Sequence, residues 1–303
     1  MPPRTLLVLN PAAGQGDPDR LLRQLAGAFA VRGEAFDVAK TAGPGDAEEA
    51  ARLAAAEGYR AVVAIGGDGT LGEVLTGTAG TGLPVGVIPR GTGNQVACNL
   101  GIPRALEAAV EVAVRGTPVP IDLGQMDDGR YFALAAGAGW DAAMIALATR
   151  QMKDRWGFGA YVYAGMRVGV AKPTSLFRIT ADGVTVEAQA AMVLVANMGQ
   201  FGARLIAPNG LLVGPAVSPR DGLLDVCIFA PRGRRDLPAL LWRIARGRYS
   251  GDERLVYLQG ADVTVESDPP AITEVDGELS GPTPLRARVV PGGATILVPR
   301  SAA

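Results

Sequence analysis

Residues 61–75, AVVAIGGDGTLGEVL, hold the pattern that decides the fold of the N-terminal part of the chain. Ala61 to Ile65 is apolar on both faces, as in a parallel strand that helices cover on both sides. A glycine-rich turn, Gly66 to Thr70, follows directly, and we expect a helix from Leu71. The order of strand, tight turn and helix is the building unit of a doubly wound α/β sheet.

The same order recurs before and after this stretch. Strands are expected at 6–9, 35–39 and 85–88, and helices at 19–30, from 46 onward and at 104–115. Asp46 opens the second helix, and Glu49 stands three residues on, as in a capping box. Strands that alternate with helices predict a parallel sheet with a ligand site beyond the carboxyl ends of its strands.

The pattern changes after about Pro120, where short strands are separated by Gly, Pro and Asp turns. We expect strands at 176–180, 184–189, 191–196, 223–229 and 262–266, a buried last strand at 294–298, and helices around 139–170 and 234–248. The second part therefore reads as a mostly antiparallel, β-sandwich-like domain. We predict a nucleotide-binding domain at 1–121 and a β-rich domain at 122–288, with 289–303 able to join the first as its last strand.

Composition excludes several classes of protein. The chain has 303 residues, a net charge of −1 and a pI of about 5.7, so it lacks the basic field of a nucleic-acid binder. It contains no histidine, which excludes Ser-His-Asp triads and HExxH metal sites. Its two cysteines, Cys98 and Cys227, lie far apart and give no CxxC pair. No apolar run has the length of a membrane span, and the N-terminal run is too short for a signal peptide, so we expect a soluble cytoplasmic protein.

Three glycine loops follow three of the predicted strands: Asn10 to Gly16 (NPAAGQG), Gly66 to Thr70 (GGDGT) and Gly91 to Asn94 (GTGN). All three should open on one edge of the sheet, where free N–H groups at a helix start attract phosphate oxygens. An acid at position 68 would repel phosphate, so Asp68 indicates Mg²⁺ or contact with a proton donor. Plain turns are the alternative. The loops match neither GxGxxG nor GxxxxGK[ST].

These motifs, together with GVIPRGTGNQVACNLGIP at 86–103, resemble the catalytic domain of the diacylglycerol, sphingosine and ceramide kinases. The chain is most similar to the bacterial soluble lipid kinases of that superfamily. Further matches cover essentially the whole chain: Asp122-Leu-Gly124, Gly137-Ala-Gly139, Asn209-Gly210, Asp221 to Asp225 (DGLLD) and Val275 to Glu278 (VDGE).

The resemblance implies an ATP- and Mg²⁺-dependent transfer of phosphate to a lipid hydroxyl, as in phospholipid biosynthesis. ATP would lie on the edge of the first domain that faces the second. The implied nucleotide-binding residues are Asn10, Pro11, Ala12, Ala13, Gly14, Thr41, Gly66, Gly67, Asp68, Gly69, Thr70, Glu73 and Thr92. The lipid would approach from the β-rich domain.

The resemblance also implies a proton acceptor at Glu278, with Asp276 beside it, and a catalytic role for Asp68. If the VDGE segment is extended, Asp276 and Glu278 share one face, and paired carboxylates can raise one pKa. The alternative is an ordinary acidic turn, because Asp-Gly is a common turn pair.

A second, structural Mg²⁺ site is implied at Ser218-Pro-Arg-Asp-Gly-Leu223. Its ligands would be Ser218, Asp221 and the carbonyl oxygen of Leu223, and a plain hairpin turn is the alternative. Two positions depart from the family pattern. Gln95 replaces an acid, and Arg90 stands where an apolar residue is more usual, with either phosphate contact or exposure to solvent as its interpretation.

The substrate implies peripheral, transient contact with a membrane surface. Residues 232–248 contain six arginines and Trp242, which suits an interfacial helix on anionic lipid, as does the segment with Lys153, Arg155, Trp156 and Phe158. A solvated basic helix is the alternative. A kinase of the NAD kinase type and a non-catalytic nucleotide or lipid sensor remain rival functions, and the oligomeric state, a homodimer included, stays open.

Overall fold

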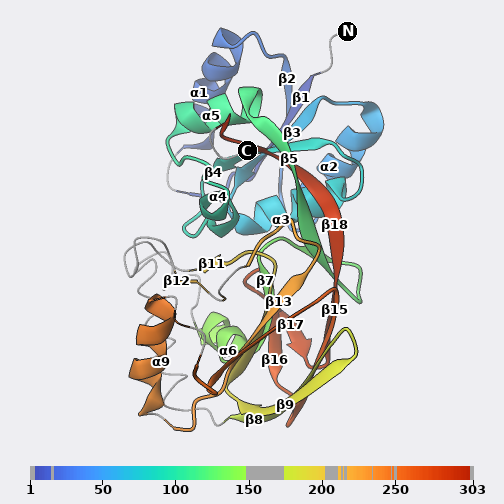
Figure 1. Cartoon of the computed structure of the whole chain (residues 1–303). Helices are drawn as coiled ribbons and strands as arrows, with labels where there is room; N and C mark the ends of the chain where they lie inside the picture. Colours follow the sequence, from blue (N-terminus) through green and yellow to red (C-terminus); the bar gives the residue numbers. More distant parts are fainter. Residues whose placement is uncertain are drawn as a thin grey trace. The chain divides into compact units, whose positions relative to one another are not determined.

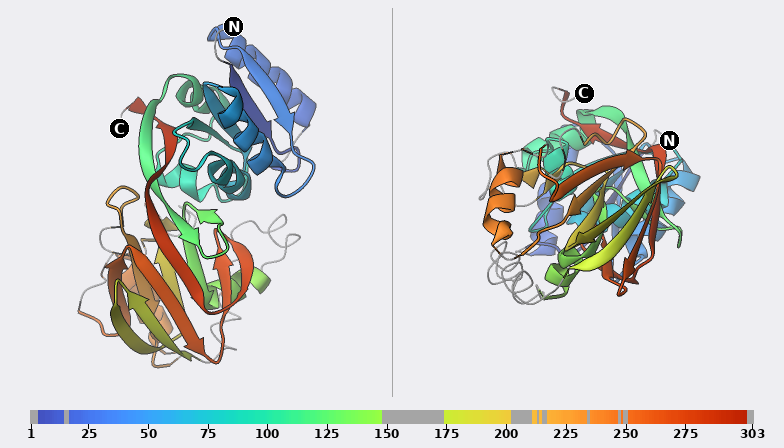
Figure 2. Two further views of the ribbon diagram at one scale, coloured as in Figure 1. Left: turned by 90° about the vertical axis from the view of Figure 1, so that its right-hand side faces the viewer. Right: turned by 60° about the horizontal axis from the view of Figure 1, so that its bottom comes forward.

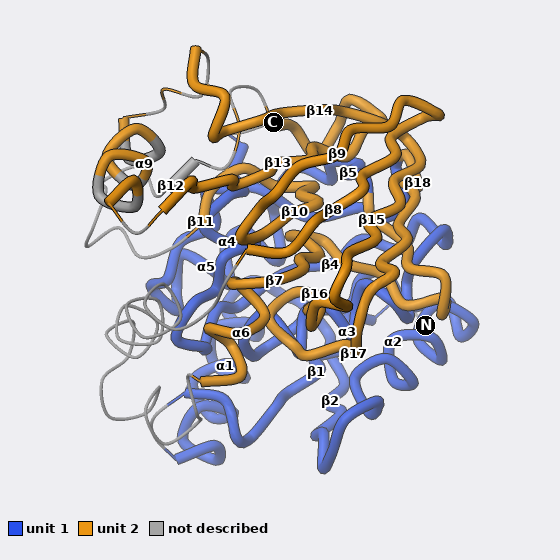
Figure 3. Tube along the Cα trace, turned by 90° about the horizontal axis from the view of Figure 1, so that it is seen from below, with its two compact units in different colours: residues 1–122, 292–303 blue, residues 123–291 orange. Residues whose placement is uncertain are grey.

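The computed structural model describes residues 4–14, 17–147, 174–201, 211–212, 214, 217–233, 235–246, 248 and 251–300. The chain divides into two compact units (Figure 3). Unit 1 comprises residues 1–122 and 292–303, and unit 2 comprises residues 123–291. The segment around Lys153, Arg155, Trp156 and Phe158 lies outside the described residues, as do Asn209-Gly210 and Gln15-Gly16 of the first loop.

Unit 1 is built on a parallel sheet with the strand order β2-β1-β3-β4-β18. Its strands are β1 (Thr5–Leu9), β2 (Phe36–Lys40), β3 (Ala61–Gly66), β4 (Pro84–Pro89) and the end of β18 (Leu285–Val298). Its helices are α1 (Pro18–Val31), α2 (Asp46–Glu57), α3 (Asp68–Thr78), α4 (Gln95–Asn99) and α5 (Leu106–Arg115). The doubly wound prediction is confirmed (Figure 1).

Apolar residues of unit 1 cover both faces of this sheet. Leu7 and Ile65 on the strands pack with Leu25 and Phe29 of α1 and with Val110 of α5 in one buried cluster. Side chains alternate along a strand, so the intervening residues of β1 and β3 point to the opposite face. Helices α2 and α3 pack against each other and against these strands. Burial on both faces explains the continuous apolarity of the strands in sequence.

Unit 2 contains two antiparallel sheets, which confirms the predicted β-rich domain. One has the order β18-β15-β8-β9 and the other the order β14-β13-β10-β7-β16-β17. The strands are β7 (Ala135–Gly139), β8 (Ser175–Ala181), β9 (Val184–Ala190), β10 (Met192–Ala196), β13 (Leu224–Phe229), β14 (Leu255–Gly260), β15 (Asp262–Asp268), β16 (Ile272–Val275) and β17 (Glu278–Pro282). Smaller strands are β6 (Tyr131–Phe132), β11 (Gln200–Phe201) and β12 (Leu211–Leu212), and β5 (Thr117–Met126) pairs with β18.

The core of unit 2 takes side chains from both sheets. Phe177, Ile179 and Val263 come from the first sheet, and Val195 and Ile228 come from the second. Two described helices accompany the sheets: α6 (Trp140–Leu147), directly after β7, and α9 (Asp236–Ala245). Within the described residues, no helix combines the length and apolarity that a membrane span needs.

Two local predictions were wrong. Helix α3 begins at Asp68 rather than at Leu71, so the acid belongs to its first turn. Helix α2 has no capping box: its N-cap residue is Gly45, and the Asp46 carboxylate accepts hydrogen bonds from the N–H groups of residues 42 and 43 instead. Glu49 forms an ion pair with Arg52.

The last strand is also longer than its apolar segment. Strand β18 has 14 residues and can be followed as the long red strand in Figure 2. Its first four residues, Leu285 to Arg288, pair antiparallel with β15, and Thr295 and Ile296 pair parallel with β4. Burial alternates over these first four residues, and the last five residues, 294–298, are mostly buried, as the apolar segment predicts.

Candidate active site

The three glycine loops of unit 1 meet at one edge of the sheet, as predicted from their positions after the strands. Strands β1, β3 and β4 are neighbours and run parallel, so their carboxyl ends lie side by side. The backbone N–H of Asn10 donates to Ile65 O, and the N–H groups of Arg90 and Gly91 donate to Gly66 O. Backbone hydrogen bonds thus connect the first loop to β3 and the third loop to the second.

Thr70 connects the first two loops through its side chain. Asn10 Nδ2 donates to Thr70 Oγ1 at 3.0 Å, and Asn10 Oδ1 accepts from the N–H of Ala12 at 2.9 Å. A Cβ on Gly66 would lie 2.4 Å from Thr70 Oγ1. Gly67 packs against Gly91, whose added Cβ would lie 2.6 Å from Gly67 Cα.

The two central glycines are therefore required for space. Positive φ is not the reason at Gly66 and Gly67, because neither adopts a left-handed conformation. Gly14 does, with φ +81°, and a Cβ there would also lie 2.8 Å from Arg90 O.

Asp68 lies half-buried between the second and third loops. Its Oδ1 accepts a hydrogen bond from the N–H of Val96 at 3.2 Å, and its Oδ2 would lie 3.1 Å from a Cβ added to Gly93. Burial raises the pKa of the Asp68 carboxyl, and backbone N–H groups of Gln95, Val96 and Asn94 oppose that shift. Asp68 is thus a carboxylate held by backbone amides, with its Oδ2 next to Gly93.

The third loop is braced from within and from behind. Asn94, buried and in the left-handed conformation, accepts from the N–H of Gly91 at 2.9 Å and donates to Gly91 O at 2.6 Å. Arg104 Nη2 donates to the backbone carbonyl oxygen of Thr92 at 2.9 Å. The side chain of Thr92 is exposed on the loop. The loop is therefore held rigid while its hydroxyl faces outward.

Two other residues that were predicted to bind nucleotide, Thr41 and Glu73, form hydrogen bonds within unit 1. Thr41 follows β2 and donates its N–H to Leu9 O at 2.9 Å. Glu73 accepts from the N–H of Ala47 at 3.1 Å, so its carboxylate serves the N-terminus of α2. Arg90 is half-buried, and its Nε is buried without a hydrogen-bond partner among the described residues. Exposure to solvent was therefore the wrong interpretation for Arg90.

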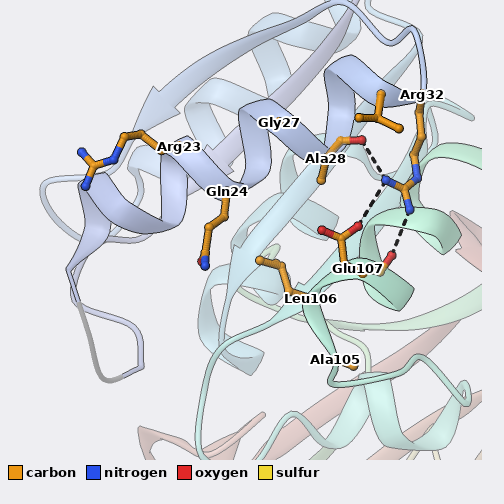
Figure 4. A pocket seen from close by; sticks show the side chains of 9 residues that line it. Arg23, Gln24, Gly27, Ala28, Arg32, Ala105, Leu106 and Glu107 are labelled. Atoms are coloured by element: carbon orange, nitrogen blue, oxygen red, sulfur yellow. Dashed lines mark hydrogen bonds and ion pairs between the residues drawn. The ribbon is translucent and has the colours of Figure 1, made fainter.

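A shallow hollow of about 530 Å³ lies elsewhere in unit 1, between α1 and α5 (Figure 4). Arg23, Gln24 and Leu106 are among its lining residues. Arg32 at its rim donates to Glu111 at 2.8 Å and to Ala28 O at 2.8 Å, so its guanidinium is already occupied. None of the three glycine loops contributes to this hollow.

The VDGE segment of unit 2 forms a two-residue hairpin turn between β16 and β17. Asp276 has φ 47° and Gly277 has φ 90°, as a type I′ turn requires, so the segment is not extended at these residues. The Asp276 carboxylate accepts from the N–H groups of Ala133, Leu134 and Ala135, each at 2.9 Å. Glu278 opens β17 with an exposed side chain. The condition for a shared face is therefore not met.

A buried acid next to this turn was missed from the sequence. Glu274 is only 5% exposed, and its Oε2 accepts from the N–H of Gly277 at 2.7 Å. Strand pairing places Glu274 opposite Gly137, and Asp141 lies at the same point. In the sequence, the only sign of this buried acid is the glycine at position 137. The register of β7 and β16 is needed to show that Glu274 lies beside that glycine.

The segment at 218–223 forms a compact turn. Asp221 is exposed, and its Oδ1 accepts from the N–H of Leu223 at 3.1 Å. Asp225 beyond it is fully buried, bonded to the hydroxyl of Tyr257 and to Gln259 Nε2. Burial raises the pKa of Asp225, and it also raises the pKa of the Tyr257 hydroxyl. Among the described residues, no three acidic or cysteine side chains gather as a metal cluster.

Comparison with known proteins agrees with both units. Residues 4–126 match the diacylglycerol kinase catalytic domain, and residues 135–298 match the YegS C-terminal NAD kinase beta sandwich-like domain. A diacylglycerol kinase of Mycobacterium tuberculosis is 32% identical over 302 residues, covering 96% of this chain and 94% of the relative. A diacylglycerol kinase of Bacillus subtilis is 29% identical, covering 93% and 91%. The crystal structure of a diacylglycerol kinase from Bacillus anthracis has the same fold, with a TM-score of 0.80, 24% identity and coverage of 99% and 98%.

The chain is therefore a phosphotransferase that acts on an alcohol group. It belongs to the family of diacylglycerol kinases and YegS lipid kinases. Membership in a family of enzymes argues against the non-catalytic sensor.

Proposed function

We propose that this chain transfers the γ-phosphoryl group of ATP to the hydroxyl of a lipid, with Mg²⁺ at Asp68. One observation carries the proposal: the Asp68 carboxylate lies among three interlocked glycine loops at the carboxyl edge of a parallel sheet. Phosphoryl transfer depends on positioning and charge neutralisation, and this edge offers backbone amides together with one acid. Family membership supports a lipid as the substrate.

The donor set at Asp68 fits Mg²⁺ and a nucleotide. Mg²⁺ commonly takes one or two protein carboxylates and completes its shell with phosphates and water. Asp68 Oδ2 lies beside Gly93, where a Cβ would come within 3.1 Å of it, so the glycine avoids crowding this carboxylate oxygen. When bound, Mg²⁺ would neutralise phosphate charge beside this carboxylate.

The residues around Asp68 have separate roles in the proposal. Thr92 has an exposed hydroxyl that can donate to a phosphate oxygen. Arg90, whose Nε is buried without a partner among the described residues, supplies positive charge beside the first loop. Asn10 and Thr70 hold the first two loops together through their 3.0 Å hydrogen bond. In unit 2, Glu278 and Asp276 remain the proposed proton acceptor and its neighbour, and Ser218, Asp221 and Leu223 the proposed structural Mg²⁺ ligands.

Helix α9 supports the proposal of a membrane-facing surface. Leu240 is buried with Ala191 and Phe229 and so anchors the helix to unit 2. Trp242 remains 51% exposed, and the guanidinium groups of Arg246 and Arg248 lie 5.0 and 5.6 Å from its ring centroid. An exposed indole flanked by two cations suits the interface of an anionic bilayer.

The test of the enzymatic proposal is transfer of radiolabelled phosphate from ATP. Separate reactions would contain vesicles with diacylglycerol, sphingosine, ceramide or phosphatidylglycerol, and one would contain soluble NAD⁺. We expect a labelled lipid in the wild type and a turnover roughly 10²–10⁴ lower in Asp68→Ala and in Glu278→Ala. Glu57→Gln, which changes an exposed acid of α2, serves as the control and should match the wild type.

Each result has a clear meaning. Near-wild-type turnover in a folded Asp68→Ala protein would exclude Asp68 from the reaction. Label on NAD⁺ alone would favour a kinase of the NAD kinase type, because the second domain matches an NAD kinase beta sandwich-like domain.

For Arg90→Leu, we expect a KM for ATP roughly tenfold higher with little change in kcat, since one charged hydrogen bond contributes about that much. An unchanged KM would remove Arg90 from the phosphate site.

The membrane proposal has its own test in vesicle flotation. Vesicles of phosphatidylcholine with increasing phosphatidylglycerol should bind the wild type progressively. Trp242→Ala should weaken binding at every composition, whereas Arg246→Gln with Arg248→Gln should remove mainly the dependence on anionic lipid. Arg178→Gln, a change at an exposed ion pair on β8, is the control. Binding that ignores anionic lipid content would refute the electrostatic part.

A further inference from the structure

Two buried carboxyl groups of unit 2, Asp141 and Glu274, face each other where Gly137 lacks a side chain. A Cβ on Gly137 would lie 1.5 Å from Asp141 Oδ2 and 2.9 Å from Glu274 Oε1. Asp141 Oδ2 therefore occupies the position that a methyl group would take, and Glu274 Oε1 lies beside that position. Three elements contribute to this pair: β7 supplies the glycine, α6 supplies Asp141, and β16 supplies Glu274.

The other oxygen of each carboxyl already accepts a backbone hydrogen bond. Ala142 N–H donates to Asp141 Oδ1 at 2.8 Å, and Gly277 N–H donates to Glu274 Oε2 at 2.7 Å. Asp141 Oδ2 is buried and has no hydrogen-bond partner among the described residues. A buried carboxylate oxygen without a donor is costly, and two adjacent negative charges are costlier.

A proton shared by the two carboxyl groups would stabilise this arrangement better than a bound metal cation would. The titratable side chains on the elements packed against α6 are Glu274 on β16, Asp276 in the turn and Glu278 on β17, and all are acids. Strand β7 contributes none. The described residues form no metal cluster here, and no ion pair involves Asp141 or Glu274. One proton between the two free-facing oxygens would supply the missing donor and remove one charge.

We propose that Asp141 and Glu274 share one proton, and that this carboxyl pair is a positioning device for the turn that carries Asp276 and Glu278. Glu274 holds the turn through Gly277, and Asp141 holds Glu274 through the shared proton. The effect on catalysis rests on the proposed function, whereas the shared proton does not. Burial raises the pKa of Asp141 to about 7, and burial together with the charge of Asp141 raises the pKa of Glu274.

The sign of the pH dependence follows from these directions. Each carboxyl has a folded-state pKa above its unfolded value, so its folded state binds protons more tightly. The stabilisation is complete below about pH 4, the unfolded pKa, and is lost as pH rises through about 7. Unit 2 of the wild type should become less stable between pH 5 and pH 8.

The direct test is thermal unfolding of the full chain at pH 5, 6, 7 and 8. The wild-type Tm should fall by roughly 5 °C or more across this range. In Glu274→Gln the amide N–H takes the place of the shared proton and cannot be lost, so its Tm should change much less. Glu266→Gln, at an exposed acid of β15, is the matched control and should follow the wild type. A Glu274→Gln profile parallel to the wild type would overturn the shared proton.

The positioning role needs a second readout, phosphate transfer from ATP to diacylglycerol vesicles. Glu274→Ala should lower kcat at least tenfold with an unchanged KM for ATP, and Glu274→Gln should recover kcat to within threefold at pH 6. Equal losses in both variants would overturn the positioning role. If the wild type phosphorylates none of the lipids, the proposed function fails, yet the Tm profiles still decide the shared proton.

Discussion

Substituting Gly66 by alanine tests the geometry of the glycine loops most directly. The added Cβ would meet Thr70 at Oγ1, Cβ and Cγ2, at 2.4, 2.6 and 2.9 Å. Thr70 is 6% exposed and accepts a hydrogen bond from Asn10, so it has little room to move. Forcing a methyl into a packed site costs about 1–3 kcal/mol, and losing the Asn10–Thr70 hydrogen bond adds about 1 kcal/mol.

The expected outcome for Gly66→Ala is a destabilisation of about 2–4 kcal/mol, or a Tm roughly 5–15 °C lower. Because the displaced residues form the first two loops, we also expect a KM for ATP at least tenfold higher. Gly72→Ala is the matched control: it lies in α3, the helix that follows the second loop, and an added Cβ meets nothing within 4 Å. It should be neutral or up to about 1 kcal/mol more stable. Equal stability of the two variants would refute the steric reasoning.

Two further predictions concern packing and acid stability. Gly77→Ala would place a Cβ 2.3 Å from Glu48 O, so it should destabilise unit 1 by about 1–3 kcal/mol. The KM for ATP, measured by varying the nucleotide concentration, should stay unchanged. A raised KM would contradict this. Hydrogen bonds from the N–H groups of Ala261 and Asp262 lower the pKa of Asp182, so its stabilisation is present above about pH 4 and lost as pH falls through the folded pKa. Asp182→Asn should lower Tm at pH 7 and match the wild type near pH 2; a constant difference would contradict this.

The parallel sheet of unit 1 was predictable because its signals are local. Continuous apolar strands, glycine turns at their ends and amphipathic helices each occupy short windows of sequence. The meeting of the three loops at one edge also follows from strand direction alone. The details at the helix starts were less accurate. Helix α2 begins at Asp46 as predicted, but the Asp46 carboxylate bonds to the turn before the helix, and α3 begins at Asp68 rather than at Leu71. Both details depend on backbone geometry.

The acids of unit 2 were harder to interpret because their roles depend on pairing between distant strands. Asp276 bonds to three N–H groups about 140 residues earlier in the chain, a partnership that no local pattern encodes. Glu274 looks like one more acid before an Asp-Gly turn. Its burial follows from its register opposite Gly137, and that register appears only in the folded sheet. Function at these residues therefore had to come from family resemblance.

Strand β18 has a consequence for biosynthesis. Unit 1 needs residues 292–303 to complete its sheet beside β4, and those residues are translated only after all of unit 2. The N-terminal 122 residues must therefore keep one sheet edge unpaired until residues 292–303 have been translated. A nascent chain stalled before residue 292 should remain sensitive to protease throughout its first 122 residues, and a chain extended past residue 303 should protect them.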